Sequence, residues 1–161
     1  MILCIIITAA VIAADQLSKL AAIGALADGG WFDVIPGVLR FAYVENRGAA
    51  FGMLSDHRWV FMLLSAVAVI LLIVYLLREK PKSRLVRLSL ALIVGGGIGN
   101  MIDRTLRGYV VDFIDVTAVK FYVFNIADMA VCIGCGLLIL HLISSELKER
   151  KKSGNGENLK S

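Results

Sequence analysis

Four long apolar runs, separated by shorter polar stretches, dominate the pattern of hydrophobic and polar positions along the chain. The runs cover residues 2–26, 59–77, 85–102 and 124–143. A helix needs about 20 mostly apolar residues to cross the hydrocarbon core of a bilayer, and each run is close to that length. The pattern therefore predicts four transmembrane helices.

The positions of Lys and Arg between these runs predict how the helices are oriented. Cytoplasmic loops of membrane proteins carry an excess of basic residues. We therefore expect both termini and the link between the second and third runs to lie in the cytoplasm, and the two longer connections to lie outside. The basic residues of that link and of the C-terminal tail are Arg78, Lys80, Lys82, Arg84, Arg87, Lys148, Arg150, Lys151 and Lys152.

The length of the chain and its polar end predict the domain organisation. A chain of 161 residues has room for one sizeable core. We expect residues 1–152 to form a single membrane-embedded domain. Residues 153–161 are polar, and this composition is typical of a disordered tail.

The first outer connection, at about residues 28–57, is predicted to form a small sheet. Residues 32–37 and 38–44 read as short strands around a turn at Pro36 and Gly37. In the second outer connection, residues 109–114 are expected to be extended or helical and partly buried. Aromatic rings near the first connection suit the headgroup region of a bilayer; they belong to Trp31, Phe32, Phe41, Tyr43 and Trp59.

The composition excludes several classes of protein. Hydrophobic residues make up 58% of the chain and charged residues 19%, against about 45–50% and about 25% in soluble domains. A disordered chain, a fibrous repeat and a disulfide-rich secreted module are therefore excluded. The net charge is +4, but the membrane topology accounts for the basic residues, so no nucleic-acid partner is expected.

Motifs for metal or redox chemistry are weak in this sequence. Cys4, Cys132 and Cys135 lie in apolar runs and are expected to be small buried hydrophobic side chains. Cys132 and Cys135 form a C-x-x-C pair, but no flanking pattern suggests a zinc or redox site. An H-E-x-x-H motif is absent from the sequence. We expect neither a metal nor an organic cofactor.

Polar residues in or beside the apolar runs converge on one side of the predicted membrane. An ionisable residue inside a span costs about 2.5–3.5 kcal/mol on insertion scales, so it marks a candidate functional site. At about 1.5 Å per residue, Asp15 lies about 20 Å from the cytoplasmic end of its helix. The topology brings it into the outer third of the bilayer with the other candidates, which are Asn46, Arg47, Asn100, Asp103, Arg104, Asp112, Asn125 and Asp128.

Structural roles compete with functional ones at some of these positions. Asp103 and Arg104 are adjacent and of opposite charge, so a structural ion pair or helix cap is favoured over catalysis. Neighbouring helix residues do not face each other, so Ser18 and Lys19 are not expected to form a catalytic pair. Lys19 is expected to extend its charge toward the outer interface.

The small and amide residues also have two interpretations each. Asn46 and Asn100 can satisfy irregular backbone near the membrane, or they can bind substrate. Gly48 permits a tight turn or close approach of a ligand. A glycine cluster in the third run allows either close helix packing or the approach of a lipid-bearing substrate; it comprises Gly95, Gly96, Gly97 and Gly99.

Three classes of function remain open on spacing alone. Carboxylates are the plausible catalytic groups, and they suit an aspartic protease. Intramembrane Asp15, Asp112 and Asp128 could instead form a proton or ion relay, although they lie on one side of the membrane and no internal repeat is visible. A scaffold, whose polar residues serve only helix packing, is the third class.

Five sequence blocks resemble those of a known family, the type II signal peptidases, which are the bacterial lipoprotein signal peptidases. The blocks are DQLSK at 15–19, NRGAAF at 46–51, GGIGNMIDR at 96–104, VVDFI at 110–114 and FNIAD at 124–128. Each block is weak alone, but they occur in the family's order and extend over most of the chain. The resemblance implies an all-α integral membrane fold of four transmembrane helices, with a small outer β-cradle at about residues 28–57 and a short outer helix.

The resemblance also implies a function and a set of site residues. It implies an aspartic endopeptidase of the bacterial cytoplasmic membrane, active near the outer face, that cuts prolipoproteins just before a diacylglyceryl-modified cysteine. Asp112 and Asp128 match the catalytic pair; Asp115 lies close by, but the V-x-D-F pattern favours Asp112. The expected partners are these precursors and membrane lipids, and the chain is expected to be a monomer. Supporting positions are Asp15, Asn46, Gly48, Asn100, Asp103, Arg104 and Asn125.

Overall fold

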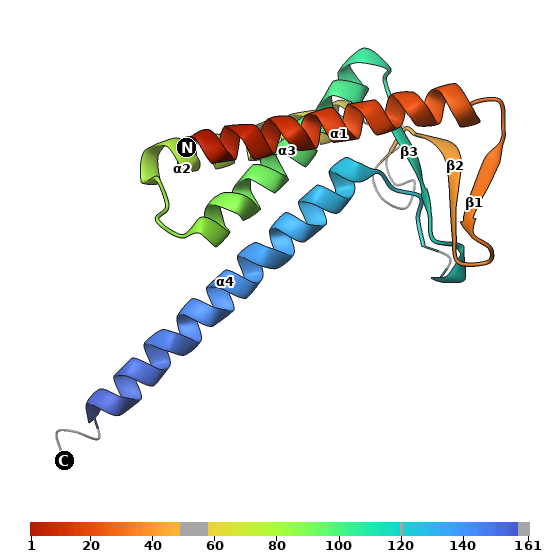
Figure 1. The fold of residues 1–161 in the computed structure, drawn as a ribbon. Coiled ribbons are helices and arrows are strands. Elements are labelled where there is room, and N and C mark those ends of the chain that lie inside the picture. The colour runs from red at the N-terminus through yellow and green to blue at the C-terminus, as the bar shows by residue number, and fades with distance from the viewer. Residues whose placement is uncertain (49–57, 120, 158–161) are drawn as a thin grey trace.

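The computed structural model describes residues 1–48, 58–119 and 121–157. Within them, four helices are long and apolar enough to cross a membrane, which confirms the four predicted spans. Figure 1 shows these helices at one side of the molecule and a small sheet at the other. The helices are α1 (Ile2–Leu26), α2 (Arg58–Glu79), α3 (Arg84–Leu106) and α4 (Ile126–Glu157).

Helix α3 is the centre of the bundle, because it packs against α1, α2 and α4. Its glycines permit this close approach. A Cβ atom at Gly96 would overlap the carbonyl oxygen of Ala127 on α4, and one at Gly95 would press on Val11 of α1. These glycines therefore serve helix packing, which was one of their two predicted roles.

The sheet has three antiparallel strands in the order β1-β2-β3. The strands are β1 (Trp31–Ile35), β2 (Leu39–Asn46) and β3 (Val110–Asp115). The first two confirm the predicted pair of strands, and Gly37 takes a positive φ of 74° in the turn between them. The segment predicted to be extended or helical is strand β3, and all six of its residues are buried.

A short backbone ladder joins the sheet to the start of α4. Phe124 and Ile114 exchange backbone hydrogen bonds of 2.8 and 3.0 Å, and Phe113 also donates to Phe124 at 3.0 Å. Outside the four long helices, the helical element among the described residues is the 3-10 turn η2 (Thr117–Val119). The end of the predicted cradle, residues 49–57, lies outside the described part of the chain.

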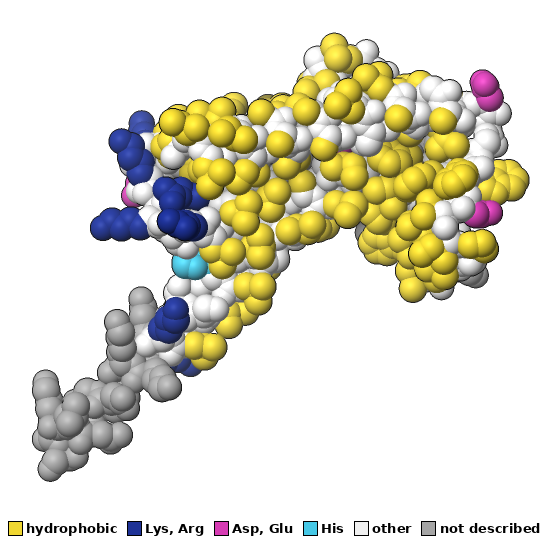
Figure 2. Space-filling model, in the orientation of Figure 1, with side chains coloured by type: hydrophobic (Ala, Val, Ile, Leu, Met, Phe, Trp, Pro, Cys, Tyr) yellow, Lys and Arg dark blue, Asp and Glu magenta, His cyan; other side chains and the backbone are white. Residues whose placement is uncertain are grey.

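The outer surface of the helices is hydrophobic, as Figure 2 shows. Figure 2 also shows Lys and Arg side chains gathered at the end of the bundle that carries the N-terminus and the α2–α3 link, away from the sheet. Trp31 and Phe32 are exposed at the sheet and Trp59 at the start of α2. An apolar surface of this extent belongs in contact with lipid.

The expectation that all three cysteines are buried is corrected. Cys4 is buried, but Cys132 and Cys135 are exposed on α4, because an apolar helix in a membrane can face lipid as well as protein. Helix α4 also continues to Glu157, into the tail for which the polar composition predicted disorder.

Candidate active site

The two acidic residues that the sequence singles out come from different elements and meet at one groove. Asp112 lies in strand β3, and Asp128 lies in the first turn of α4. Both line a groove of about 810 Å³ whose walls are mainly apolar. The groove residues come from β2, α3, β3, the segment 121–124 and α4, and include Val44, Asn46, Gly48, Asn100, Arg104, Val110, Phe121, Phe124 and Met129.

Asn125 holds the two acidic residues in a fixed relation. Its side-chain oxygen accepts a hydrogen bond of 2.9 Å from the backbone N–H of Asp128, and its own backbone N–H donates to Asp128 Oδ2 at 3.3 Å. This reciprocal pair is a capping box at the N-terminus of α4. The side-chain amide of Asn125 donates to Asp112 Oδ1 at 2.6 Å, so one buried residue contacts both carboxyls.

Asp112 is almost fully buried and has a second amide donor. Asn46 Nδ2, at the end of β2, donates to Asp112 Oδ2 at 2.9 Å. Burial raises the pKa of Asp112 to about 6; the hydrogen bond from Asn46 opposes this shift, and the negative charge of Asp128 adds to it. Gly48 donates its backbone N–H to Asn46 Oδ1 at 3.1 Å and so orients that amide.

Asp128 is fixed from the opposite side by helix α3. Asn100 Nδ2 donates to Asp128 Oδ1 at 2.7 Å, and Asn125 Nδ2 lies 3.2 Å from Asn100 Oδ1. The carboxylate also lies at a helix N-terminus, where the macrodipole favours negative charge. The amide hydrogen bonds therefore orient both carboxyls toward the groove.

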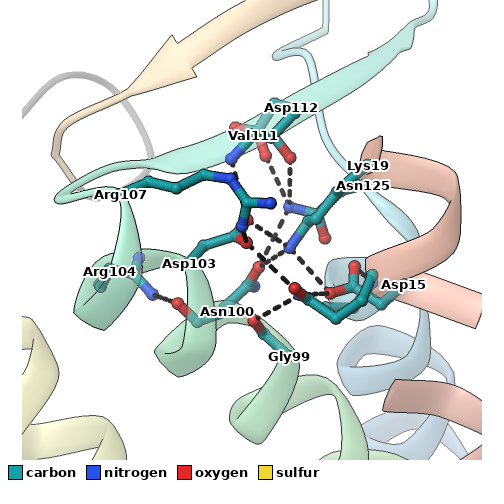
Figure 3. Close-up of polar contacts among 12 residues, drawn as sticks. Asp15, Lys19, Gly99, Asn100, Asp103, Arg104, Arg107, Val111, Asp112 and Asn125 are labelled. Carbon is teal, nitrogen blue, oxygen red and sulfur yellow. Dashed lines mark hydrogen bonds and ion pairs between the residues drawn. The ribbon is translucent and has the colours of Figure 1, made fainter. Parts of the chain in front are cut away.

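Behind the groove lies a buried charge cluster, shown in Figure 3. Lys19 Nζ lies 2.9 Å from Asp15 Oδ2 and 2.9 Å from Asp103 Oδ2, and all three side chains have 0% exposure. Arg107 completes the cluster, with Nη1 2.6 Å from Asp103 Oδ1. The expectation that Lys19 reaches the outer interface is wrong, because two buried carboxylates on its own and a neighbouring helix attract its charge.

The expected ion pair between Asp103 and Arg104 is also absent from the described contacts. Adjacent helix residues point in different directions, so Asp103 faces the cluster while Arg104 lines the groove. Arg104 donates to the backbone oxygen of Asn100 at 3.4 Å. The neighbouring acid, Asp115, forms an ion pair of 2.7 Å with Arg40.

Every predicted site residue therefore lies in the groove or in the cluster directly behind it. The sequence analysis missed the participation of Lys19, Gln16 and Arg107. Gln16 Nε2 donates to Asp15 Oδ2 at 3.0 Å and to the backbone oxygen of Gly99 at 3.2 Å. A signal was present in the sequence: Lys19 follows Asp15, and Arg107 follows Asp103, at the four-residue spacing that brings charges together on a helix.

The outer rim of the groove carries a second polar group. Arg47 pairs with Glu45 at 2.8 Å, and its guanidinium lies 5.6 Å from the ring centre of Tyr109. The hydroxyls of Tyr43 and Tyr109 are 3.1 Å apart. These contacts hold a cation at the mouth of the groove, beside the two acidic residues.

Fold and site together define the class of this chain as a multi-pass membrane protein with paired carboxyls in an apolar groove. The family model described as signal peptidase (SPase) II matches residues 7–144. The lipoprotein signal peptidase of Brevibacillus brevis is 39% identical over 90% of this chain and 97% of its own length. Those of Symbiobacterium thermophilum and Clostridioides difficile are 40% and 39% identical over 91% of this chain and 97% and 98% of their own lengths.

Solved structures agree with these sequence matches. Two structures of a bacterial membrane enzyme superpose with TM-scores of 0.83 and 0.81 at 32% and 33% identity. They cover 91% and 88% of this chain and 90% and 93% of the solved chains. The chain belongs to the signal peptidase II family and is a multi-pass bacterial membrane peptidase. This membership favours the protease among the three classes of function that spacing left open.

Proposed function

We propose that this chain is an aspartic endopeptidase that removes the signal peptide from prolipoproteins, cutting just before a cysteine that carries diacylglycerol. The relatives at about 40% identity are named lipoprotein signal peptidases, which supports the substrate class. The observation that carries the aspartic mechanism is the Asn125 bridge, which contacts the carboxyls of both Asp112 and Asp128.

Two carboxyls in one poorly solvated site supply the chemistry that peptide hydrolysis needs. Like charges held close together do not both ionise easily, so the pair can share a proton. The ionised member takes a proton from a water molecule as that water attacks the peptide carbonyl carbon. The protonated member donates a hydrogen bond to the carbonyl oxygen and stabilises the tetrahedral intermediate, and a proton then passes to the leaving amine. The pair titrates as a unit, so neither role is assigned to one residue.

The groove suits a substrate that carries both peptide and lipid. Asn46, Asn100 and Arg104 provide polar contacts near the carboxyls, and Val44, Phe121, Phe124 and Met129 provide apolar wall. Withdrawing lipid tails from a bilayer costs about 0.8 kcal/mol per CH₂. A site at the membrane lets the tails stay in lipid while the peptide bond reaches Asp112 and Asp128.

The proposed orientation places both termini in the cytoplasm and the groove near the outer face. The basic residues lie at the end of the bundle remote from the sheet (Figure 2), which fits the excess of Lys and Arg on cytoplasmic loops. The precursor crosses the membrane, so its processed bond lies near the outer face. The enzyme is proposed to act as a monomer among membrane lipids, without a cofactor or nucleic acid.

The decisive experiment uses the purified full chain in lipid vesicles with two precursors, one with diacylglycerol on its cysteine and an unlipidated twin. We expect cleavage of the first only. Asp112→Asn and Asp128→Asn should each remain folded and lose cleavage by at least about 100-fold. Asp115→Asn is the matched control, because it removes a carboxyl from the same strand that pairs with Arg40, and it should cleave normally. Full activity in either candidate variant, or equal cleavage of both precursors, overturns the proposal.

A further inference from the structure

Lys19 lies at the centre of the buried polar contacts behind the groove. Its ammonium has three N–H donors and three acceptors in reach: Asp15 Oδ2, Asp103 Oδ2 and Asn100 Oδ1, each at 2.9 Å. All the donor capacity of this ammonium is therefore matched inside the bundle. Figure 3 shows these partners arranged around the labelled lysine, between α1, α3 and β3.

Each of the three partners also contacts Asp128 itself or the residue just before Asp112 or Asp128. Asp15 Oδ1 accepts a hydrogen bond of 3.0 Å from the backbone N–H of Ala127, the residue before Asp128. Asp103 Oδ2 accepts one of 3.1 Å from the backbone N–H of Val111, the residue before Asp112.

The third partner, Asn100, donates directly to Asp128 Oδ1 at 2.7 Å. Lys19 is thus one contact away from the backbone that precedes each acidic residue and one contact away from the Asp128 carboxylate. Strand β3 and helix α4 are tied to the same ammonium from two sides.

The charges around this ammonium are balanced. Asp15 and Asp103 supply two negative charges, and Lys19 and Arg107 supply two positive ones. Arg104, which lines the groove, then balances an acidic pair that holds a single proton. Removing the charge of Lys19 leaves a buried carboxylate without its partner, and such uncompensated charge is costly in a poorly solvated interior.

We propose that Lys19 is a positioning residue for the acidic pair: its ammonium fixes the spacing between β3 and α4, and its positive charge acts on the buried carboxyls from behind the groove. This inference rests on the proposed function, because it assigns Lys19 a part in the reaction of Asp112 and Asp128. A lysine with only a structural role would affect stability and leave the reaction of the folded enzyme unchanged.

The test compares Lys19→Gln with the unchanged chain in lipid vesicles, using the lipidated precursor. We expect kcat to fall about 10–100-fold, because small displacements of catalytic groups have effects of this size. KM should change less than about threefold, because Lys19 is fully buried and does not line the groove walls. Thr8→Val is the matched control: it removes a hydrogen bond of 3.2 Å to Ala91 between the same two helices, and it should lower only the Tm.

The dependence of activity on pH gives a second measurement, because a loss of stability alone does not shift this profile. The positive charge of Lys19 lowers the pKa of Asp112, so its removal should shift the whole activity profile toward higher pH. The charged groups that face the pair from the packed elements are Asp15, Lys19, Glu45, Arg47, Asp103, Arg104 and Arg107, and all but Lys19 remain in the variant. A folded Lys19→Gln with kcat within twofold and an unmoved profile overturns the proposal.

A double variant keeps the test valid if Lys19→Gln does not fold. Asp15→Asn with Lys19→Gln removes one charge of each sign, and the asparagine oxygen can still accept from Ala127. This variant should fold, yet its kcat should stay at least about fivefold low, because Asp103 and Asn100 lose their shared donor. Recovery to within twofold contradicts the proposal. Asp128→Asn is measured in parallel: if it cleaves normally the aspartic mechanism itself fails, whereas if it is inactive and Lys19→Gln is active only the present inference fails.

Discussion

Asn125 donates its side-chain amide to the Asp112 carboxylate at 2.6 Å. The same residue caps helix α4 and accepts the backbone N–H of Asp128 at 2.9 Å. The start of a transmembrane helix and the middle of a buried strand are thereby joined through one amide. Because the amide is neutral, it orients both carboxyls without supplying a charge that would force both to ionise.

The two roles of Asn125 can be separated by substitution. Asn125→Ser keeps a good N-cap side chain that is too short to reach Asp112, whereas Asn125→Ala loses both functions. We expect Asn125→Ala to lower stability by about 1 kcal/mol and Asn125→Ser to lower it less. Both should lose at least about tenfold in cleavage, measured with the lipidated precursor beside thermal unfolding. Normal cleavage by Asn125→Ser, with its cap intact, contradicts a bridging role.

The raised pKa of Asp112 predicts how stability depends on pH. Its pKa is about 6 in the folded chain and about 3.9 in an unfolded one. Between these values the folded state binds more protons at Asp112, so the contribution of Asp112 to stability is fully present below about pH 4 and is lost as pH rises through 6. Asp112→Asn removes this loss, so its free energy of unfolding at pH 8 should exceed that of the unchanged chain by about 1–3 kcal/mol, and its Tm should be higher. No such gain is expected at pH 4. Equal pH dependence in the two proteins, followed by Tm in detergent, counts against a buried ionisable Asp112.

The contact between α3 and α4 at Gly96 should be intolerant of one added methyl group. A Cβ at Gly96 meets the carbonyl oxygen of Ala127 and the Val131 side chain, so Gly96→Ala must push α4 away from α3. Overpacking of this kind costs about 1–3 kcal/mol, and it also separates Asn100 from Asp128. We expect a lower Tm and reduced cleavage. Gly136→Ala on α4 is the control, because a Cβ there meets nothing within 4 Å, and it should have normal activity. Equal behaviour of the two variants argues against this packing role.

Much of the fold follows from the sequence because length and hydropathy constrain a membrane helix strongly. The residues of α1 were predicted with the bounds that the structure has, Ile2–Leu26, and the turn at Pro36 and Gly37 was recognised from its residue types. The end of α4 was not predicted, because a polar helix beyond the membrane has no hydropathy signal. The exposure of Cys132 was also missed, because an apolar side chain faces lipid or protein without any difference in sequence.

The sequence predicted which residues form the candidate site, but not which of them contact each other. Topology and the family resemblance brought Asp112 and Asp128 to one side of the membrane. The partner of each charge depends on helix rotation: Asp103 turns toward Lys19 and Arg107, while Arg104 turns toward the groove. Hydropathy alone treats Lys19 as a residue near an interface, because the carboxylate of Asp103 that holds it lies far away in the sequence.

The proposed orientation can be checked with single cysteines placed at the two ends of the bundle. Asp33 is exposed on β1, and Lys82 is exposed in the link between α2 and α3. The native cysteines are first replaced by serine. Asp33→Cys should then react with a membrane-impermeant maleimide added to cells whose outer layers are permeable and whose cytoplasmic membrane is intact. Lys82→Cys should react only after the inner membrane is lysed, because basic links stay in the cytoplasm. Cleavage of the lipidated precursor by each variant shows that the labelled protein has the native fold. The reverse labelling pattern would put the groove on the cytoplasmic side. A precursor that has already crossed the membrane does not present its processed bond there, so the proposed function would fail together with the topology.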